Sequence, residues 1–462
     1  MLFNSLLFFL FFLIVTSCYY LLPYKLRWVW LLGASCYFYM YFRPQYILII
    51  LFTIIIDYIA GLLIERASGK KRKLLLMVSI SANVGVLGFY KYFNFLAENI
   101  NILLGTAKMQ PIPLVDFILP IGLSFHTFQA MSYTIEVYRG RQLAERHFGI
   151  YALYVMFYPQ MVAGPIERPQ HILPQLHHFH NFSGSKFMTG IFLMTVGLFK
   201  KMVIADRLGL YVDPVFSHPH GHSALDLALA TYFFAFQIYC DFSGYSDIAI
   251  GAALTLGIEL MKNFNMPYLA TNIAEFWKRW HISLSTWFRD YLYIPLGGNR
   301  GTFFTTCVNL LIVFLISGLW HGANWKYLVW GGMHGCLLVL YHVSKKINIR
   351  LKGFMFLKWF LTFNLVCLAW IFFRANTVAD GFYILQKIGS FSGLAYSAGT
   401  IMAAKEIGYC SFIILGLLAG EWYLRRSTEF SNEKKAAVIL SLAVACYFLG
   451  IFNEAQFIYF QF

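Results

Sequence analysis

The sequence contains little charge for its length. Asp, Glu, Lys and Arg make up 12% of its 462 residues, whereas about 25% of the residues of a typical soluble domain are charged. Hydrophobic residues account for 59% of the chain, and a water-soluble globule of this size cannot bury that much apolar surface. The scarcity of charge therefore excludes a soluble or disordered protein and predicts a polytopic membrane protein.

Other common patterns are also absent. The eight cysteines are scattered singly, without a Cys-x-x-Cys motif, so we expect neither a disulfide framework nor a metal site. No basic region precedes the apolar residues 1–22 and no small-residue cleavage site follows them, which favours a retained first span over a signal peptide. The net charge of +15 comes from short basic clusters between apolar runs. Such clusters determine topology, so we expect no nucleic-acid partner.

Apolar runs recur along the whole chain. A spanning helix needs about 20 apolar residues at a rise of about 1.5 Å each. Runs of this kind, or nearly so, fall near residues 1–22, 28–42, 46–64, 74–96, 114–137, 187–205, 224–240, 303–320, 326–344, 355–373, 407–424 and 436–453. Two shorter stretches, 148–164 and 245–260, are candidates for re-entrant segments. We predict an all-α protein with roughly ten to twelve transmembrane helices plus re-entrant or interfacial helices.

The distribution of Lys and Arg predicts the orientation. The first charge, Lys25, follows the first span, so the N-terminus should face outward and the basic clusters should face the cytoplasm. The C-terminus should then also lie outside, while charges do not determine the topology between 148 and 262. Without internal repeats, the chain is predicted to be one integral domain, 1–462. We divide it into N-terminal spans (1–140), a catalytic core (148–344) and C-terminal spans (355–462).

Two stretches each place one histidine among tryptophans, His281 in Glu275–Arg300 and His321 in Ser317–Trp325. A titratable group at membrane depth is costly and therefore indicates function. The alternative is that both are core histidines bonded to neighbouring carbonyl groups. Two such histidines beside polar and small residues favour a buried reaction chamber, and the 19% aromatic content suits the walls of a cavity for an acyl chain or cofactor.

On a helix, Glu275–Arg300 would carry an apolar stripe that contains His281, with cations largely off the stripe. These cations could attract the phosphates of coenzyme A. The alternative is an interfacial helix that anchors on anionic lipid. The residues predicted to bind the acyl donor are Trp277, Lys278, Arg279, Arg289 and Asn324.

His321 ends an apolar run and lies between Gly318 and Gly322, which allow close approach of another backbone or a substrate. Asn324 offers a hydrogen-bond partner, and Trp320 and Trp325 can exclude water. An imidazole with a pKa near roughly 6.5 is a suitable general base for a hydroxyl nucleophile.

Several long motifs, in order, give the chain a resemblance to the membrane-bound O-acyltransferase family, in its bacterial polysaccharide-modifying branch. Besides both histidine motifs, they are FYKYFNF (Phe89–Phe95), LPIGLSFHTFQAMSYTIEVYRG (Leu119–Gly140), FYPQMVAGPIERP (Phe157–Pro169), DFSGYSDIAIG (Asp241–Gly251) and WIFFRA (Trp370–Ala375). The resemblance implies a many-helix fold around a central funnel, with His321 as the principal catalytic residue and His281 near the funnel on the cytoplasmic side.

The resemblance also implies the reaction and the partners. The acyl group would come from a cytoplasmic thioester, acetyl-CoA, and would pass across the bacterial inner membrane to an exported polysaccharide. An extracytoplasmic SGNH-type O-acetyltransferase would act as partner. The last residues, Phe457–Phe462 (FIYFQF), resemble a terminal FxYF pattern of this branch, which would make Tyr459 an acyl carrier and therefore a third catalytic residue. The alternative is that these aromatic residues anchor the C-terminus at the outer interface.

Two other functions stay open at this point. A polytopic chain with polar residues at mid-membrane could be a transporter or flippase, although no repeated half with broken helices supports this. A lipid- or protein-acylating member of the same superfamily would account for the histidines but not for the terminal motif. The sequence does not say whether alginate, peptidoglycan or another glycan is acetylated.

Overall fold

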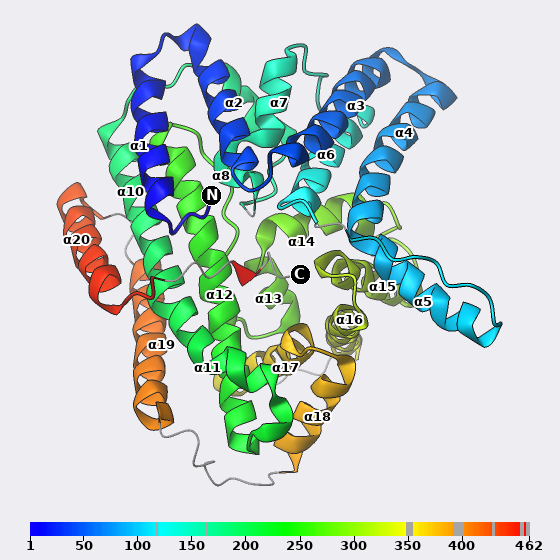
Figure 1. Ribbon diagram of the computed structural model, residues 1–462, viewed down its shortest axis with the longest axis vertical. Helices are drawn as coiled ribbons and strands as arrows, with labels where there is room; N and C mark the ends of the chain where they lie inside the picture. The colour runs from blue at the N-terminus through cyan, green and yellow to red at the C-terminus, as the bar shows by residue number, and fades with distance from the viewer. Residues whose placement is uncertain are drawn as a thin grey trace. The chain divides into compact units, whose positions relative to one another are not determined.

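The protein is helical throughout its described residues (Figure 1). The structure is a computed structural model that describes residues 1–116, 119–162, 164–347, 354–390, 402–426, 430–452 and 457–458. No strand occurs in these ranges, which confirms the predicted all-α class. The chain forms two compact units: unit 1 contains Met1–Met194 and Ile248–Met261, and unit 2 contains Thr195–Asp247 and Lys262–Phe462.

Unit 1 contains the N-terminal helices. These are α1 (Leu6–Leu21), α2 (Tyr24–Met40), α3 (Ile47–Arg66), α4 (Gly69–Leu87), α5 (Phe93–Thr106), α6 (Leu123–Tyr138), α7 (Phe148–Met156), α8 (Tyr158–Met161) and α9 (Pro169–His177), with a 3-10 turn at Pro44–Tyr46 and a π-helical turn at Gly88–Tyr92. Two further helices, α10 (Gly184–Leu198) and α12 (Ala224–Thr255), contribute residues to both units.

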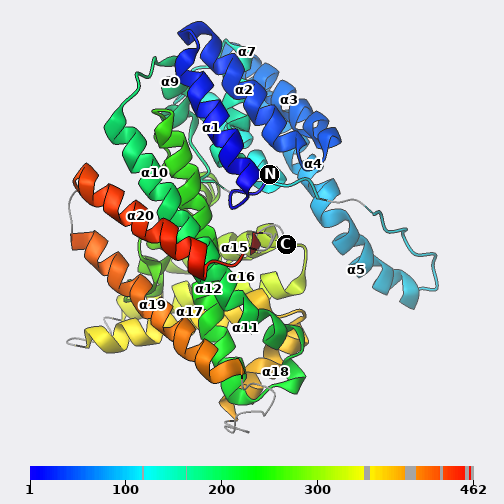
Figure 2. The ribbon, with the colours of Figure 1, turned by 60° about the vertical axis from the view of Figure 1, so that its left-hand side comes forward.

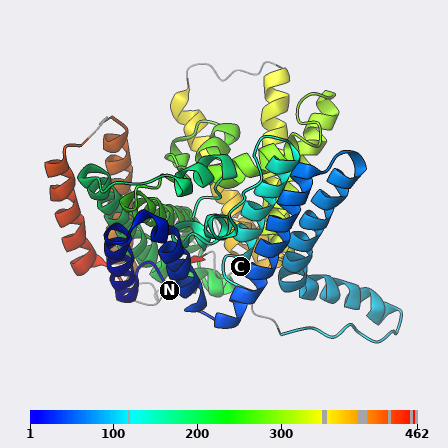
Figure 3. The ribbon, with the colours of Figure 1, turned by 90° about the horizontal axis from the view of Figure 1, so that it is seen from above.

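Helices α3, α4 and α6 pack together within unit 1 (Figures 1 and 3). A buried carboxylate lies at their contact: Asp57 on α3 accepts hydrogen bonds from Ser79 Oγ at 2.6 Å and from Asn83 Nδ2 at 2.8 and 2.9 Å, both on α4. Ser79 Oγ also lies 3.0 Å from the Thr134 hydroxyl on α6. A buried polar group of this kind is tolerated because it is bonded on several sides.

Unit 2 contains both histidine motifs. Its helices are α11 (Asp206–Ser217), α13 (Ile273–Arg279), α14 (Ile282–Phe288), α15 (Phe303–His321), α16 (Trp325–Lys346), α17 (Met355–Arg374), α18 (Val378–Gly389), α19 (Met402–Arg426) and α20 (Asn432–Leu449). π-Helical turns occupy Phe199–Ala205 (η3) and Arg289–Tyr293 (η6), and 3-10 turns occupy Pro219–Gly221 and Pro267–Leu269. Just after α20 (Figure 2), the Ile451 amide donates to the Met202 carbonyl on η3 at 3.1 Å.

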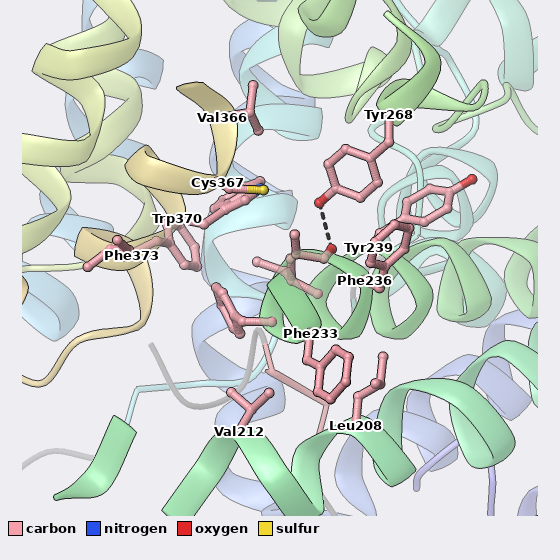
Figure 4. Packing of buried hydrophobic residues seen from close by; sticks show 14 of the residues in the cluster. Leu208, Val212, Phe233, Phe236, Tyr239, Tyr268, Val366, Cys367, Trp370 and Phe373 are labelled. Carbon is pink, nitrogen blue, oxygen red and sulfur yellow. Dashed lines mark hydrogen bonds between the residues drawn. The ribbon is translucent and has the colours of Figure 1, made fainter. Parts of the chain in front are cut away.

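The core of unit 2 is aromatic, and α12 and α17 contribute much of it. Figure 4 shows Phe233, Phe236 and Tyr239 of α12 and Trp370 of α17 within this cluster. The α12 ring that packs against Trp370 is Phe234, at 6.3 Å between centroids. The buried Tyr268 hydroxyl donates to the Ala235 carbonyl at 2.6 Å. Tyrosine buries a large apolar area while its hydroxyl finds a hydrogen-bond partner, as Tyr268 does in this core.

Five helical stretches are long and apolar enough to cross a membrane: Pro44–Arg66, Gly69–Thr106, Gly184–Ser217, Phe303–His321 and Met355–Arg374. The protein is therefore a membrane protein with several candidate spans. The expected total of ten to twelve spans stays a prediction. The stretch 245–260, considered above as a separate re-entrant segment, instead begins as the continuation of α12, which runs unbroken to Thr255.

Candidate active site

The hairpin of α15 and α16 determines the position of His321. The two helices pack at backbone distance: a Cβ atom added to Gly318 would lie 2.2 Å from the Tyr327 carbonyl oxygen, and one added to Gly331 would lie 2.2 Å from that of Phe314. Only glycine allows such an approach. His321 is the last residue of α15, so this contact places its imidazole against α16.

The turn after His321 is equally constrained. Gly322 has an extended backbone, and a Cβ atom there would lie 2.1 Å from the Tyr327 ring. Asn324 is the N-cap of α16, where its Oδ1 accepts from the Lys326 amide at 3.0 Å. The asparagine predicted as a partner for the histidine thus caps a helix, a role that its residue type favours.

His321 is almost fully buried, with 5% of its surface exposed, and aromatic rings surround it. Its ring centroid lies 5.0 Å from Trp320, 4.9 Å from Trp330 on α16 and 5.4 Å from Phe373 on α17, in each case edge to face. Trp325, by contrast, is 56% exposed, so Trp320 and Trp330 form the apolar wall that the sequence assigned to Trp320 and Trp325.

The spacing of apolar residues predicted that His281 lies inside a continuous helix, but the structure shows a break there. Helix α13 ends at Arg279, α14 begins at Ile282, and His281 between them is left-handed, with φ of 42° and ψ of 56°. This conformation costs a non-glycine residue about 1–2 kcal/mol. Backbone bonds from a distant segment offset the cost: Asn265 donates to Arg279 at 2.9 Å and Ile282 donates to Asn263 at 2.8 Å.

The same segment orients the His281 ring, which is completely buried. Its Nδ1 lies 3.1 Å from Asn263 Oδ1. That oxygen also accepts from the Ser283 hydroxyl at 2.9 Å, so Nδ1 carries the proton and Nε2 is the basic nitrogen of the ring. Burial lowers the pKa of His281 from its ordinary 6.5 to about 3, and the imidazole is therefore neutral at physiological pH.

Trp320 brings the two histidines into one site. The His281 centroid lies 6.4 Å from the Trp320 ring, which also packs against His321. A third imidazole, His334 on α16, lies 4.9 Å from Trp330 and accepts a hydrogen bond at Nδ1 from Trp277 Nε1 at 3.3 Å. Buried imidazoles thus alternate with indoles through the centre of unit 2.

The predicted donor-binding residues do not form one cluster. Trp277 lies in the core against His334, whereas the Lys278 side chain is exposed. Arg279 pairs with Glu275 at 2.6 Å, one helical turn away, and the exposed Arg289 pairs with Asp290 at 2.7 Å. Asn324 is the exposed helix cap described above. Lys278 and Arg289 are therefore the members of this set whose cations face outward.

The run of polar residues from Asp241 to Asp247 does not break the helix, because α12 continues through it. Asp241 is buried and accepts from Lys201 Nζ at 2.7 Å, and Lys201 also bonds Asp206 at 2.8 Å. This ion cluster was not predicted from the sequence, because its lysine lies 40 positions earlier, on η3. The lysine pair at 200–201 inside an apolar run was the available signal.

Two residues of the C-terminal tail, Phe457 and Ile458, also contact this part of α12. Phe457 and Ile458 are buried, and the Ile458 amide donates to Asp241 Oδ2 at 2.9 Å. The Phe457 ring packs 4.8 Å from Tyr245 and 5.6 Å from Phe242. Phe242 in turn lies 4.5 Å from the His281 ring. Tyr459, predicted as acyl carrier, lies outside the described residues.

Among the described residues, no group of three or more His, Cys, Asp or Glu side chains is arranged to hold a metal ion. His126, a further histidine within an apolar segment, belongs to unit 1. It is buried there, with its Nε2 lying 2.6 Å from Thr53 Oγ1.

Comparison with known proteins supports the resemblance that the motifs indicated. The model of the membrane-bound O-acyltransferase family matches residues 115–381. The chain is 39% identical to "Probable alginate O-acetylase AlgI" of Pseudomonas aeruginosa over 85% of its own length and 75% of that protein. It is 32% identical to the peptidoglycan O-acetyltransferase of Helicobacter pylori, covering 94% of this chain and 91% of that protein. A teichoic acid D-alanyltransferase of Bacillus subtilis is 27% identical over 58% of this chain and 70% of that protein.

Proposed function

This chain belongs to the membrane-bound O-acyltransferase family, and on that basis we propose that it transfers acetyl groups from cytoplasmic acetyl-CoA, across the bacterial inner membrane, for O-acetylation of an exported polysaccharide. The observation that carries the proposal is the aromatic enclosure of His321, which lies between Trp320, Trp330 and Phe373. A neutral imidazole in a site that excludes water is a suitable general base for a weak nucleophile.

In the proposed first step the Tyr459 hydroxyl attacks the carbonyl carbon of the thioester. A phenol has a pKa near roughly 10 and needs a base to attack, so His321 accepts the phenolic proton. The new C–O bond forms as the C–S bond breaks, and the departing CoA thiolate takes the proton from the imidazolium. The products are free CoA and an acetyl-tyrosine ester, and His321 returns to its neutral form.

In the second step the acetyl group leaves the tyrosine. The serine hydroxyl of an extracytoplasmic SGNH-type partner attacks the phenyl ester, the ester C–O bond breaks, and the phenol regains its proton. A phenolate is a good leaving group, so the ester stays activated for this transfer. The partner then acetylates the polymer. Both termini of the chain would face the outer side of the membrane.

His281 has a supporting place in this scheme. Its Nδ1 proton is directed at Asn263, and its ring packs against Trp320 and Phe242. It would line the passage from the cytoplasmic side and keep Trp320 against His321. The outward-facing cations of Lys278 and Arg289 would attract the phosphates of acetyl-CoA.

Family membership and the named activities of the relatives favour an acyltransferase over a transporter or flippase. The alginate and peptidoglycan O-acetylating relatives, which cover most of the chain, also favour a polysaccharide over a lipid or protein acceptor. These relatives are consistent with either alginate or peptidoglycan as the polymer that is acetylated.

Labelled acetyl-CoA tests the proposal. Purified protein incubated with [¹⁴C]acetyl-CoA should carry label on Tyr459, located by mass spectrometry, and His321→Ala should lose both label and thioester turnover. His220→Ala, at an exposed histidine of unit 2, should keep both. Full turnover in His321→Ala would contradict the role of His321, and label on another residue would contradict the role of Tyr459.

A further inference from the structure

The tail segment is held at the core of unit 2 by its backbone as well as by a side chain. The Ile458 amide donates to Asp241 Oδ2 at 2.9 Å, although the two residues are 217 positions apart. A bond to the backbone does not depend on the side chain at 458. Any residue at 458 except proline could therefore make it.

The preceding residue is held by its side chain. Phe457 is 2% exposed, and its ring packs against Tyr245 and Phe242 on the same face of α12. Aromatic pairs at such distances add about 0.5–1.5 kcal/mol beyond the area they bury. These two rings therefore hold Phe457 in a specific position. Together with Asp241 they form what we call the seat of the tail.

The Asp241 carboxylate, which binds the tail amide, is itself fixed by an ion pair with Lys201. Asp241 uses Oδ1 to accept from Lys201 at 2.7 Å and Oδ2 to accept from the tail. A buried carboxylate without enough donors is costly. The tail amide is therefore a donor that this carboxylate requires, and the seat and the tail stabilise each other.

The seat is next to the catalytic centre. Phe242 packs against Phe457 on one side and against His281 on the other, at 5.6 Å and 4.5 Å between ring centroids. The turn η3, which carries Lys201, also contains Met202, whose carbonyl accepts a hydrogen bond from the Ile451 amide. π-Helical turns of this kind are frequent at functional sites.

We propose that Asp241, held by Lys201, is a positioning residue that seats the C-terminal tail through the Ile458 amide and so presents the next residue to the acyl-transfer centre. The proposal rests on the proposed function in one respect, namely that Tyr459 is the residue presented. The seat itself is a property of residues 457 and 458 and can be tested separately.

Two changes remove the bond from opposite sides. Asp241→Ala removes the acceptor. Ile458→Pro removes the amide donor and also replaces a buried side chain of the unit 2 core. The first matched control is Asp247→Ala, which removes another carboxylate of α12, one of the two that pair with Lys200. The second is Ile458→Val, which keeps the amide. Hydrogen exchange of the 457–462 peptide and acetyl label on Tyr459 are measured in the full-length protein, with thermal unfolding to confirm that each variant is folded.

We expect both Asp241→Ala and Ile458→Pro to raise exchange of the tail peptide and to lower Tyr459 labelling by about tenfold or more, the loss expected for a hydrogen bond to a charged group. The double variant should lose little more than either single one. Both controls should resemble the wild type. Exchange and labelling within about twofold of wild type in Ile458→Pro would overturn the seat. If tail exchange rises as expected but the wild type carries no label on Tyr459, the seat stands and the tyrosine relay fails.

Discussion

The Nδ1 atom of His281 lies 3.1 Å from Oδ1 of Asn263, and this contact sets the tautomer of a completely buried imidazole. Asn263 also supplies the carbonyl that accepts from Ile282 just after the helix break. One residue therefore both shapes the left-handed turn at His281 and orients its ring.

Asn263→Leu should leave the buried Nδ1 proton of His281 without its acceptor. We expect a loss of about 1–3 kcal/mol in the free energy of unfolding and a lower rate of acetyl-CoA turnover. Thermal unfolding in detergent and a thiol-release assay measure the two effects. Asn265→Leu, at an exposed neighbour, is the control, and equal effects in the two variants would contradict the prediction.

Stability should fall in acid because of His281. Its folded-state pKa is about 3 and its unfolded-state pKa is about 6.5. Below about pH 6.5 the unfolded state binds a proton that the folded state does not, so stability decreases as the pH falls from there toward 3, by up to about 1.4 kcal/mol per pH unit.

Unfolding midpoints measured between neutral pH and pH 4 test this. His281→Gln should show a shallower loss in acid than wild type, while His178→Gln, at an exposed histidine of unit 1, should keep the wild-type slope. Parallel curves for His281→Gln and wild type would show that His281 does not titrate on unfolding.

Gly318→Ala should separate α15 from α16. The added Cβ atom would lie 2.2 Å from the Tyr327 carbonyl oxygen, and overpacking of this kind costs about 1–3 kcal/mol. Because His321 ends α15, activity should fall with stability. Gly332→Ala on the same hairpin adds a Cβ atom 3.7 Å from Leu315, an ordinary contact, and should be tolerated. Equal behaviour of the two variants would argue against close packing at Gly318.

Lys278→Ala and Arg289→Ala should raise the KM for acetyl-CoA while leaving kcat nearly unchanged. Both side chains are exposed, so each should contribute about twofold to fivefold, and the effect should shrink at high ionic strength. Steady-state kinetics at two salt concentrations measure it. Lys434→Ala, at an exposed lysine on α20, is the control, and a lower kcat with unchanged KM would place the two cations outside donor binding.

The helical class and the two histidine motifs could be predicted from composition and pattern. Long apolar runs require helices, because backbone polar groups in lipid must be satisfied within the segment. The glycines beside His321 also indicated a close approach, and the structure places backbone atoms of α16 there. Residues within a few positions of one another sufficed for these predictions.

The break at His281 could not be predicted in this way. Local spacing favours one continuous helix, but backbone bonds from residues 263 and 265 stabilise the left-handed turn. Nor could spacing show that Trp320 packs against both imidazoles, or that Asp241 bonds Lys201 and the tail.

The amino-acid sequence alone determined that this chain is a helical membrane protein with two tryptophan-flanked histidines, because hydrophobic length and residue type act locally along the chain. Tertiary structure decided which of its polar groups meet. A buried carboxylate, amide or imidazole must find its partner wherever packing provides one. For Asp241, Asn263 and His281 that partner lies 18 to 217 residues away.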